Sequence, residues 1–293
     1  MEQKQKPSNL ELGLDYKKMS ELRNKCRTKN NFLNGGLGLF VSYFKKALSI
    51  SIVLFITSCD SENGSDCFQD TGQIVKEEVE VQDFTTITVF ENVTLVVKQG
   101  ITQKVEIETG ENLRNEVAAV VEDGRLLLTD TNDCNYVRDY GTTIVYVTTP
   151  SLTEIRSSTG FPIRSDGVLN FERLSLLSES FSNPKAETTD GEFDLALSVT
   201  SLSITVNGIA YLKLKGSAES LNVNIAAGDS RIEAQELIAQ HVNLNHRGSN
   251  DILINPQSRL SGVLRGTGDV LSYTRPAEVD VEELYNGRLI FVE

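Results

Sequence analysis

Three observations predict an all-β protein whose larger part is a parallel β-helix-like solenoid. Gly208, Gly228, Gly248 and Gly268 recur at a constant interval of 20 residues. Apolar and polar residues alternate over short segments, as they do in half-buried strands. No segment after Cys59 carries a sustained 3.6-residue apolar pattern. A constant interval of this size, with two short strands in each unit, favours a solenoid over a β-sandwich with evenly spaced strands.

Residues 1–58 are interpreted as an N-terminal extension that ends in a lipoprotein signal peptide. Lys45-Lys46 precedes an uncharged run, Ala47–Ser58, and this order of basic, apolar and small residues is typical of a secretory signal. The run ends in Ile56-Thr-Ser-Cys59, which resembles the lipobox of bacterial lipoproteins. We therefore expect cleavage before Cys59, lipid on that cysteine, and attachment to the bacterial envelope, at the outer membrane.

An uncleaved membrane anchor is the alternative for the same segment. A spanning helix needs about 20 apolar residues, so the span would have to include Leu37–Phe44 upstream. Lys45 and Lys46 would then lie inside the hydrocarbon, where charged side chains are strongly disfavoured. This cost favours the cleaved and lipidated form.

Residues 59–73 are expected to form an acidic tether that contains one cysteine of a disulfide. If Cys59 carries lipid, Cys67 and Cys134 are the even pair left in the mature chain. An exported protein reaches an oxidising compartment, so we expect these two cysteines to be bonded. Metal binding is the alternative, but two isolated cysteines without a nearby histidine are poor zinc ligands.

The mature chain is strongly acidic. The whole sequence has 28 Lys and Arg against 41 Asp and Glu, and residues 1–58 hold 10 and 4 of these, which leaves 18 minus 37, or −19. Such a surface repels phosphate backbones, so no nucleic-acid partner is expected. No cofactor is expected either, although calcium stays open because carboxylate-rich exported proteins bind it.

Residues 74–151 are predicted to be non-repeating N-terminal strands that cap the solenoid. Val93, Leu95 and Val97 alternate with polar residues. Asp123-Gly124 lies between two apolar runs, which is a strong signal for a β-hairpin. An open end of a strand stack exposes unpaired edges that need cover, and these strands would supply it.

Residues 152–275 are predicted to be the repeats, each consisting of a strand, a glycine corner, a strand and a return turn. Glycine suits such a corner because it allows positive φ and close stacking of neighbouring turns. An insertion of about eight residues near Asn183–Glu192 interrupts the interval. Residues 276–293 contain Asn286-Gly287 between apolar residues, which predicts a C-terminal capping hairpin.

The region from about Val79 to Val270 resembles a known family of exported bacterial proteins. The resemblance rests on Phe84-Thr-Thr-Ile-Thr-Val, on Asp123-Gly-Arg-Leu-Leu-Leu and on serial glycine corners such as Gly266-Thr-Gly-Asp269. The family is the "putative auto-transporter adhesin, head GIN domain" family. The resemblance implies a right-handed β-helix-like fold, frequent lipid anchoring and no catalytic residues. The chain departs from the family name in having no autotransporter barrel, so attachment would depend on Cys59.

The best candidate site in the sequence is a polar stripe beside the glycine corners. It consists of Asp229, Arg231, Arg247, Asp251, Arg265 and Asp269. Stacked turns could align these residues into a binding groove, or into a solvated ladder of alternating charges that offsets like-charge repulsion. His241 and His246 are five residues apart, so in one strand they would point to opposite faces and make poor partners for a metal.

These observations predict a non-catalytic, lipid-anchored protein of the cell envelope. Its β-helix would be adhesin-like, binding an unidentified macromolecule or serving a structural role. The alternative is a calcium-assisted polysaccharide lyase or hydrolase of β-helix type, which would use the carboxylates and arginines of the stripe together. Absence of the usual hydrolase, metalloprotease and phosphate-loop motifs favours the binding protein.

Overall fold

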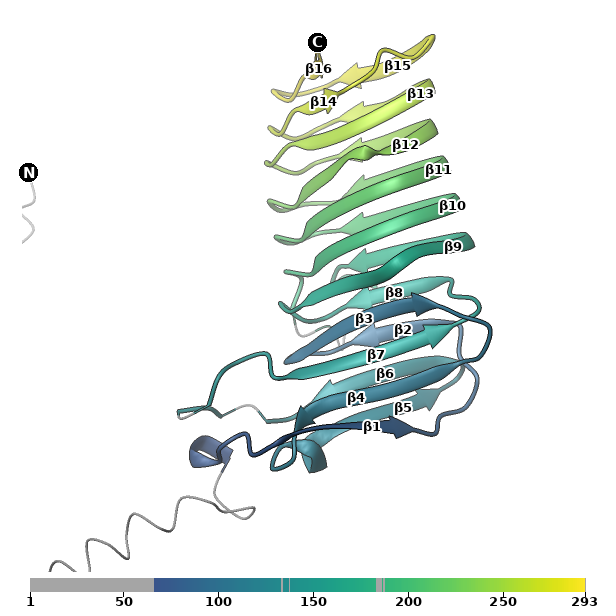
Figure 1. Ribbon diagram of the computed structural model, residues 1–293. Helices are drawn as coiled ribbons and strands as arrows, with labels where there is room; N and C mark the ends of the chain where they lie inside the picture. Colours follow the sequence, from purple (N-terminus) through teal and green to yellow (C-terminus); the bar gives the residue numbers. More distant parts are fainter. Residues whose placement is uncertain (1–65, 133, 137, 183–185, 187, 293) are drawn as a thin grey trace, which may run out of the picture. The chain divides into compact units, whose positions relative to one another are not determined.

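The structure is a computed structural model that describes residues 66–132, 134–136, 138–182, 186 and 188–292. These residues form one open sheet of 16 strands (Figure 1). The described part also holds two short 3-10 helices, η1 (Asp66–Phe68) and η2 (Arg114–Glu116), but no α-helix. Nothing in that part could cross a membrane as an apolar helix. The all-β prediction is confirmed, whereas the signal segment and Cys59 lie outside the described residues.

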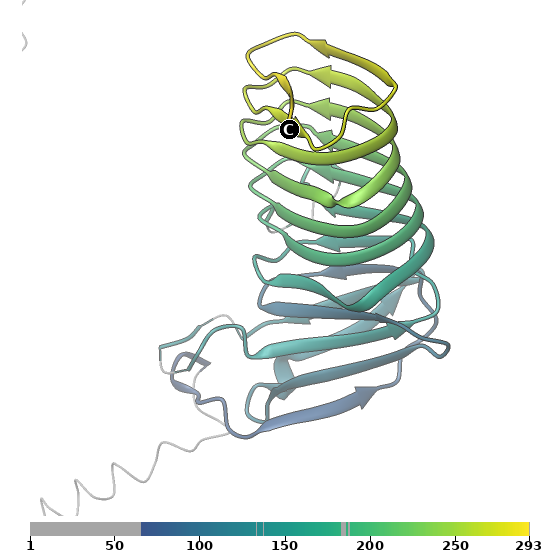
Figure 2. The same ribbon diagram turned by 45° about the horizontal axis from the view of Figure 1, so that its top comes forward.

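Strands from β9 onward stack in chain order and in parallel, as Figure 1 and Figure 2 show. Glu192 lies beside Tyr211 and Tyr211 beside Arg231, so the chain returns to the same place after 19 or 20 residues. The interval shortens to 18 residues between His246 and Leu264. The long strands are β9 (Pro162–Ser178), β10 (Glu192–Val206), β11 (Tyr211–Ile225), β12 (Arg231–His246) and β13 (Ile252–Leu264).

Each of these strands is long and bent, where the sequence predicts two short strands joined by a return turn. In β13 the bend lies between two paired parts, because Ile252–Ile254 pairs with Val270–Ser272 and Arg259–Leu264 pairs with Glu278–Glu283. At the equivalent place in β11 lies Gly216, with φ 111°. A Cβ atom at Gly216 would collide with the carbonyl oxygen of Leu197 in the strand below. The backbone therefore turns within the hydrogen-bonded ladder, and no separate loop is needed.

The periodic glycines lie in the turns that connect successive long strands, and close approach explains most of them. Of the four that define the interval, only Gly228 has positive φ, at 89°. A Cβ atom at Gly228 would collide with the carbonyl oxygen of Gly208, and one at Gly268 with that of Asn250. Stacked turns leave no room for a side chain there. Of the two predicted reasons for glycine, close stacking therefore applies to all four positions, whereas positive φ applies only to Gly228.

The N-terminal strands form a different arrangement, in which neighbours in space are not neighbours in the chain. The sheet order runs β1-β4-β7-β3-β9, so β3 is inserted between β7 and β9, and β2 lies between β6 and β8. The Asp123-Gly124 hairpin is confirmed by antiparallel pairing of β5 with β6. The strands are β1 (Ile74–Val79), β2 (Thr86–Val89), β3 (Val93–Gln99), β4 (Lys104–Gly110), β5 (Val117–Glu122), β6 (Arg125–Asp130), β7 (Thr143–Thr149) and β8 (Glu154–Ser157).

One continuous apolar core runs through both arrangements. The alternating residues Val93, Leu95 and Val97 are fully buried, as the pattern predicts. In the long strands the buried side chains recur in columns, for example Leu202, Leu221, Val242 and Leu260. Each turn therefore buries its apolar side chains against those of the next turn.

The last three strands continue the stack and do not form the predicted hairpin. They are β14 (Val270–Ser272), β15 (Glu278–Glu283) and β16 (Leu289–Phe291). β15 pairs with β13, and β16 pairs with β14, both in parallel. Gly287 lies directly above Gly268, whose carbonyl oxygen would collide with a Cβ atom there. Asn286-Gly287 is thus one more connecting turn. The hairpin prediction was wrong because glycine is required here by the stacking of turns.

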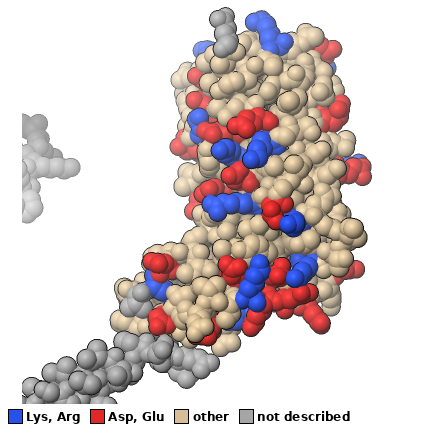
Figure 3. All heavy atoms as spheres, in the orientation of Figure 1, with Lys and Arg blue, Asp and Glu red and all other residues tan. Residues whose placement is uncertain are grey.

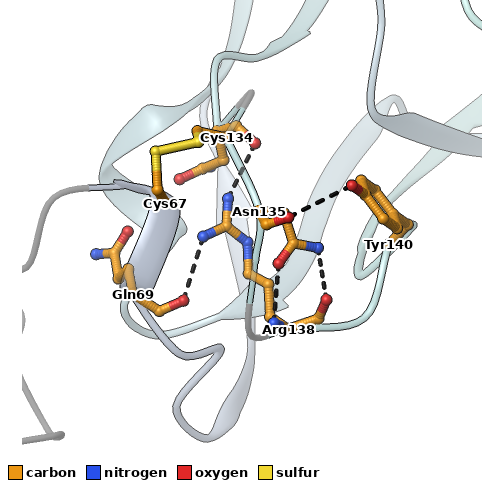
Figure 4. Close-up of a disulfide and its surroundings, with 7 residues drawn as sticks. Cys67, Gln69, Cys134, Asn135, Arg138 and Tyr140 are labelled. Atoms are coloured by element: carbon orange, nitrogen blue, oxygen red, sulfur yellow. Dashed lines mark hydrogen bonds between the residues drawn. A yellow bond between two sulfur atoms is a disulfide. The ribbon is translucent and has the colours of Figure 1, made fainter. Parts of the chain in front are cut away.

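The predicted Cys67–Cys134 disulfide is confirmed, with an S–S distance of 2.08 Å (Figure 4). It links η1 to the segment between β6 and β7. The guanidinium of Arg138 donates to the carbonyl oxygens of Gln69 (3.2 Å) and Asn132 (3.0 Å), one on each side of the disulfide. Covalent and polar links together attach the start of the described chain to the N-terminal strands.

Candidate functional site

The predicted polar stripe divides into two groups, and the first group connects successive turns. Arg231, Asp251 and Asp269 occupy equivalent places in three consecutive turns, because the residues that follow them pair in register. The backbone N–H of Asp269 donates to Asp251 Oδ1 (3.0 Å), and that of Arg288 to Asp269 Oδ1 (2.8 Å). These carboxylates therefore bind the backbone of the next turn, which is a structural task.

The other members of this group also have partners. Arg231 pairs with Glu233 (2.8 Å) and lies 4.0 Å from Asp251. The Arg231 guanidinium, with the Tyr211 hydroxyl, holds the pKa of Glu233 below its ordinary value. Asp229 accepts a hydrogen bond from Ser249 Oγ (2.6 Å). On the face shown in Figure 3, acidic and basic side chains are interspersed along the stack, as a ladder of alternating charges requires.

The second group consists of Arg247 and Arg265, which lie apart from the aspartates. Their backbone N–H groups donate to Ile225 O (2.9 Å) and His246 O (2.7 Å), so each follows its strand at the same point of consecutive turns. Within the described part of the chain, neither guanidinium has a carboxylate oxygen within 4.0 Å. The sequence placed all six residues in one stripe, but the turn around Gly248 separates Arg247 from Asp251.

Both arginines line an open hollow of about 790 Å³, which we call the arginine hollow. Its lining comes from the ends of β12 and β13 and from the residues after β15. The lining residues are Asn243, Leu244, Asn245, Arg247, Gly262, Val263, Arg265, Leu284 and Tyr285. Apart from the guanidinium groups, Tyr285 carries the one titratable side chain among these residues.

An asparagine ladder extends from the arginine hollow along the outer face of the stack. Asn245 Nδ2 donates to Asn224 Oδ1 (2.7 Å), and Ser261 Oγ donates to Asn243 Oδ1 (3.3 Å). Sequence reasoning missed the asparagines and Tyr285. The recurring interval was the signal for the asparagines, because Asn224 and Asn245 are 21 residues apart and pair in register. No comparable signal marks Tyr285, since it lies outside the 20-residue interval of Gly208 to Gly268.

The two histidines point to opposite sides of β12, as their spacing predicts. His241 is exposed and lies 3.7 Å from Glu219, whereas His246 is fully buried. Burial lowers the pKa of His246 below its ordinary value, and its Nδ1 accepts the N–H of Gly248 (3.3 Å). No group of three or more His, Cys, Asp or Glu residues arranged to hold a metal occurs in the described segments.

A second hollow, of about 350 Å³, lies beside β2, β6 and β8 and also contains two arginines. Here both are paired, Arg125 with Glu154 (2.8 Å) and Arg156 with Glu179 (2.6 Å). Burial opposes ionisation of Glu179, but hydrogen bonds from Ser182 and Arg156 hold its pKa below the ordinary value. Sequence reasoning missed this buried ion pair, because nothing in the local pattern distinguishes Arg156 from an exposed strand residue.

Comparison with known proteins agrees with the architecture. Residues 83–276 match the family model described as "Putative auto-transporter adhesin, head GIN domain". A structure from Bacteroides fragilis NCTC 9343, titled a putative adhesin, is similar with a TM-score of 0.66 at 18% identity, covering 76% of this chain and 99% of that one. The comparison with curated proteins finds no match.

A second similar structure carries a different title. It comes from Parabacteroides distasonis ATCC 8503, is titled a putative lipid binding protein, and has a TM-score of 0.51 at 16% identity. It covers 76% of this chain and 99% of that one. At such identities the two structures show a shared fold, and ligand chemistry has to be argued from the side chains of this chain.

Proposed function

Because the chain belongs to the family described as "Putative auto-transporter adhesin, head GIN domain", we propose that it is a non-catalytic, lipid-anchored protein of the bacterial cell envelope. Its stacked strands form a right-handed parallel β-helix that presents a binding surface to another macromolecule. Parallel pairing at intervals of 17 to 21 residues supports the β-helix. The segment Lys45 to Cys59 supports export and lipidation.

The arginine hollow is the observation that carries the binding function. It combines two cationic donors, neutral amides and an aromatic ring on an open surface. General acid–base catalysis needs a positioned group whose pKa lies near the working pH. The lining offers no carboxylate, histidine or cysteine for that task, and Tyr285 is its one titratable side chain besides the arginines. A lyase of the calcium-assisted type would also need carboxylates beside the arginines, but Asp251 and Asp269 bind backbone N–H groups elsewhere.

Anchoring is tested in cells that express the full chain. Radiolabelled fatty acid should enter the wild type and not Cys59→Ser, and the wild type should fractionate with the outer membrane. Equal labelling of both proteins, or an N-terminus that still carries Lys45, would contradict the anchor. Cys67→Ser is the matched control, because it removes a cysteine without removing the lipid site.

The absence of catalysis is tested separately on the purified protein. Incubation with acidic polysaccharides, with and without calcium, should release no unsaturated or reducing sugar. Calcium-dependent product that disappears in Arg247→Ala/Arg265→Ala would replace the binding protein with the enzyme.

A further inference from the structure

The arginine hollow contains an arrangement that folding alone does not favour. Arg247 and Arg265 stand at the same point of consecutive turns, and neighbouring strands are about 4.8 Å apart. Like charges on adjacent strands repel each other. Nearby arginines in the stack avoid this repulsion by facing carboxylates, as Arg259 does with Glu278 (3.2 Å) and Arg288 with Glu283 (3.6 Å).

The rest of the chain makes this pair more unexpected. Acidic residues outnumber basic ones by 41 to 28, so a carboxylate partner would be easy to supply. Two guanidinium groups that line the same hollow without a carboxylate partner form a site that is electrostatically complementary to an anion. Guanidinium groups bind carboxylates in a planar, two-point geometry.

The neutral part of the surface indicates what the anion is attached to. Asn243 and Asn245 line the hollow, and the ladder continues to Asn224 on the next strand. Primary amides both donate and accept hydrogen bonds, which matches rows of hydroxyl groups. Tyr285, with 58% of its surface exposed, adds a ring against which the apolar face of a sugar can pack.

The position of the hollow argues against a lipid headgroup as the source of the anion. The described chain starts beside the disulfide and β1. The strands that contribute to the hollow, β12 and β13, lie toward the other end of the stack (Figure 1). Seven strand-to-strand steps separate β1 from β12 in the sheet order, or about 34 Å at about 4.8 Å per step. In a chain anchored through Cys59, the hollow therefore lies about this far along the stack from β1, the first described strand after the anchor.

We propose that the arginine hollow binds a carboxylate-bearing polysaccharide and leaves it uncleaved. Arg247 and Arg265 bind the carboxylates, the asparagine ladder binds ring hydroxyls, and Tyr285 packs against a sugar ring. The inference rests on the proposed function as an envelope-anchored binding protein, and it adds the ligand class and the residues that recognise it.

Titration calorimetry of the detergent-solubilised full chain tests the proposal, with oligomers of polygalacturonate as the probe and neutral dextran as the reference. The wild type should bind polygalacturonate and not dextran. Arg247→Ala/Arg265→Ala should weaken binding at least about tenfold. Arg173→Ala/Arg259→Ala is the matched control, because it makes the same change in net charge at two exposed arginines that lie near carboxylates. It should leave the affinity within about twofold.

Two further variants separate recognition from general attraction. Tyr285→Ala should weaken binding several-fold, while Tyr285→Phe keeps the ring and should bind as the wild type does. Arg247→Lys/Arg265→Lys keeps both charges but loses the two-point geometry, so its affinity should fall between wild type and the double alanine variant.

Each other outcome overturns the proposal in an identifiable way. No binding by the wild type excludes this ligand class, and equal loss in the control variant shows attraction without a site. Binding of vesicles with anionic lipids, dependent on Arg247 and Arg265, would assign the hollow to a headgroup. All three results leave fatty-acid labelling at Cys59 unaffected, so they are distinguishable from failure of the proposed anchor.

Discussion

The N-terminal strands β1–β8 and the serial strands β9–β16 share one core, but different contacts hold them together. In the serial part, each strand pairs with strands that are close along the chain, and contacts link residues about 20 apart. In the N-terminal part, β3 pairs with β9, and Gln99 exchanges hydrogen bonds with the backbone of Asn170 (2.8 and 2.6 Å), 71 residues away. Turns that stack in series contribute locally and nearly additively to stability. Strands that pair across long stretches of chain depend on each other.

The two regions also differ in their cross-links. The Cys67–Cys134 disulfide closes a separation of 67 residues in the N-terminal part. The buried Arg156–Glu179 pair lies where the two parts meet. In the serial stack, neighbouring turns are held together by closely packed glycine turns and by side-chain hydrogen bonds between adjacent strands. Long-range order has to be stabilised by long-range links, since loop closure costs more entropy as the separation grows.

Deletions should produce the largest difference in unfolding between the two regions. Removing Gly208–Ala227 takes out one whole turn, and we expect a shorter protein that still unfolds cooperatively in urea, because Gly228 then takes the place of Gly208. Removing only Gly208–Ser217 should abolish cooperative unfolding, because it places a strand against a turn. Removing Thr86–Gln99 should do the same, because β7 and β9 lose the strand between them. Circular dichroism during urea titration measures all three, and equal loss in every deletion would contradict the serial architecture.

Removal of the disulfide should have the next largest effect on stability. Cys67→Ala/Cys134→Ala should lower the free energy of unfolding by about 4 kcal/mol, the chain-entropy value for a loop of this length. Hydrogen exchange should quicken in β1, β4 and β7 and stay unchanged in β11 and β12. Uniform acceleration through the whole stack would show that the two regions unfold as one unit.

Loss of the buried ion pair should lower the free energy of unfolding by somewhat less than loss of the disulfide. Arg156→Met leaves Glu179 buried without its guanidinium partner and should cost about 3 kcal/mol, measured by urea unfolding at pH 7. Arg125→Met is the control, because the Arg125–Glu154 pair is more exposed and should cost about 1 kcal/mol or less. Similar costs for both substitutions would mean that burial of Glu179 does not matter.

The same pair has a signed pH dependence. The pKa of Glu179 is lowered in the folded protein, so its stabilisation is present above the pKa of the unfolded chain and is lost as the pH falls through the folded value. In Arg156→Met the folded pKa of Glu179 should rise toward the unfolded value, so this loss should be smaller and should end at higher pH. An unchanged acid limb in the variant would exclude Arg156 as a cause of the shift.

His246 should give a smaller, gradual effect inside the serial stack. Its folded pKa is lowered by burial, although Asp251 and Asp269 nearby oppose the shift. The unfolded chain takes up a proton below the ordinary value of about 6.5, so stability should fall as the pH drops below that value, by at most about 1.4 kcal/mol per pH unit. His246→Leu should remove this slope, while His241→Gln, at an exposed site, should retain it.

The smallest effect is expected at the arginine hollow. Arg247→Ala/Arg265→Ala removes two exposed side chains that have no carboxylate partner, and surface substitutions usually stay within about 0.5 kcal/mol. Relief of repulsion between the guanidinium groups should keep the thermal midpoint unchanged or raise it slightly. A loss of more than about 2 kcal/mol would show that these arginines serve folding.

The sequence by itself determined the all-β class, the turn interval, the disulfide pair and the Asp123-Gly124 hairpin. Each of these depends on local or periodic information. Alternation fixes which side chains of a strand are buried, and a repeated glycine marks turns that stack without room for a Cβ atom. Cys67 and Cys134 were paired by elimination, which required no structure.

Only the tertiary structure decided how the N-terminal strands are threaded, how the chain ends and which charged residues meet. Insertion of β3 between β7 and β9 depends on contacts far apart in the chain, and no periodic pattern encodes them. Asn286-Gly287 has the local chemistry of a hairpin, but pairing of β16 with β14 prevails because it continues the stacked turns and the glycine column. Arg247 and Asp251 are four residues apart, yet a tight turn lies between them. That turn sends the aspartate into the ladder and leaves the arginine in the open hollow.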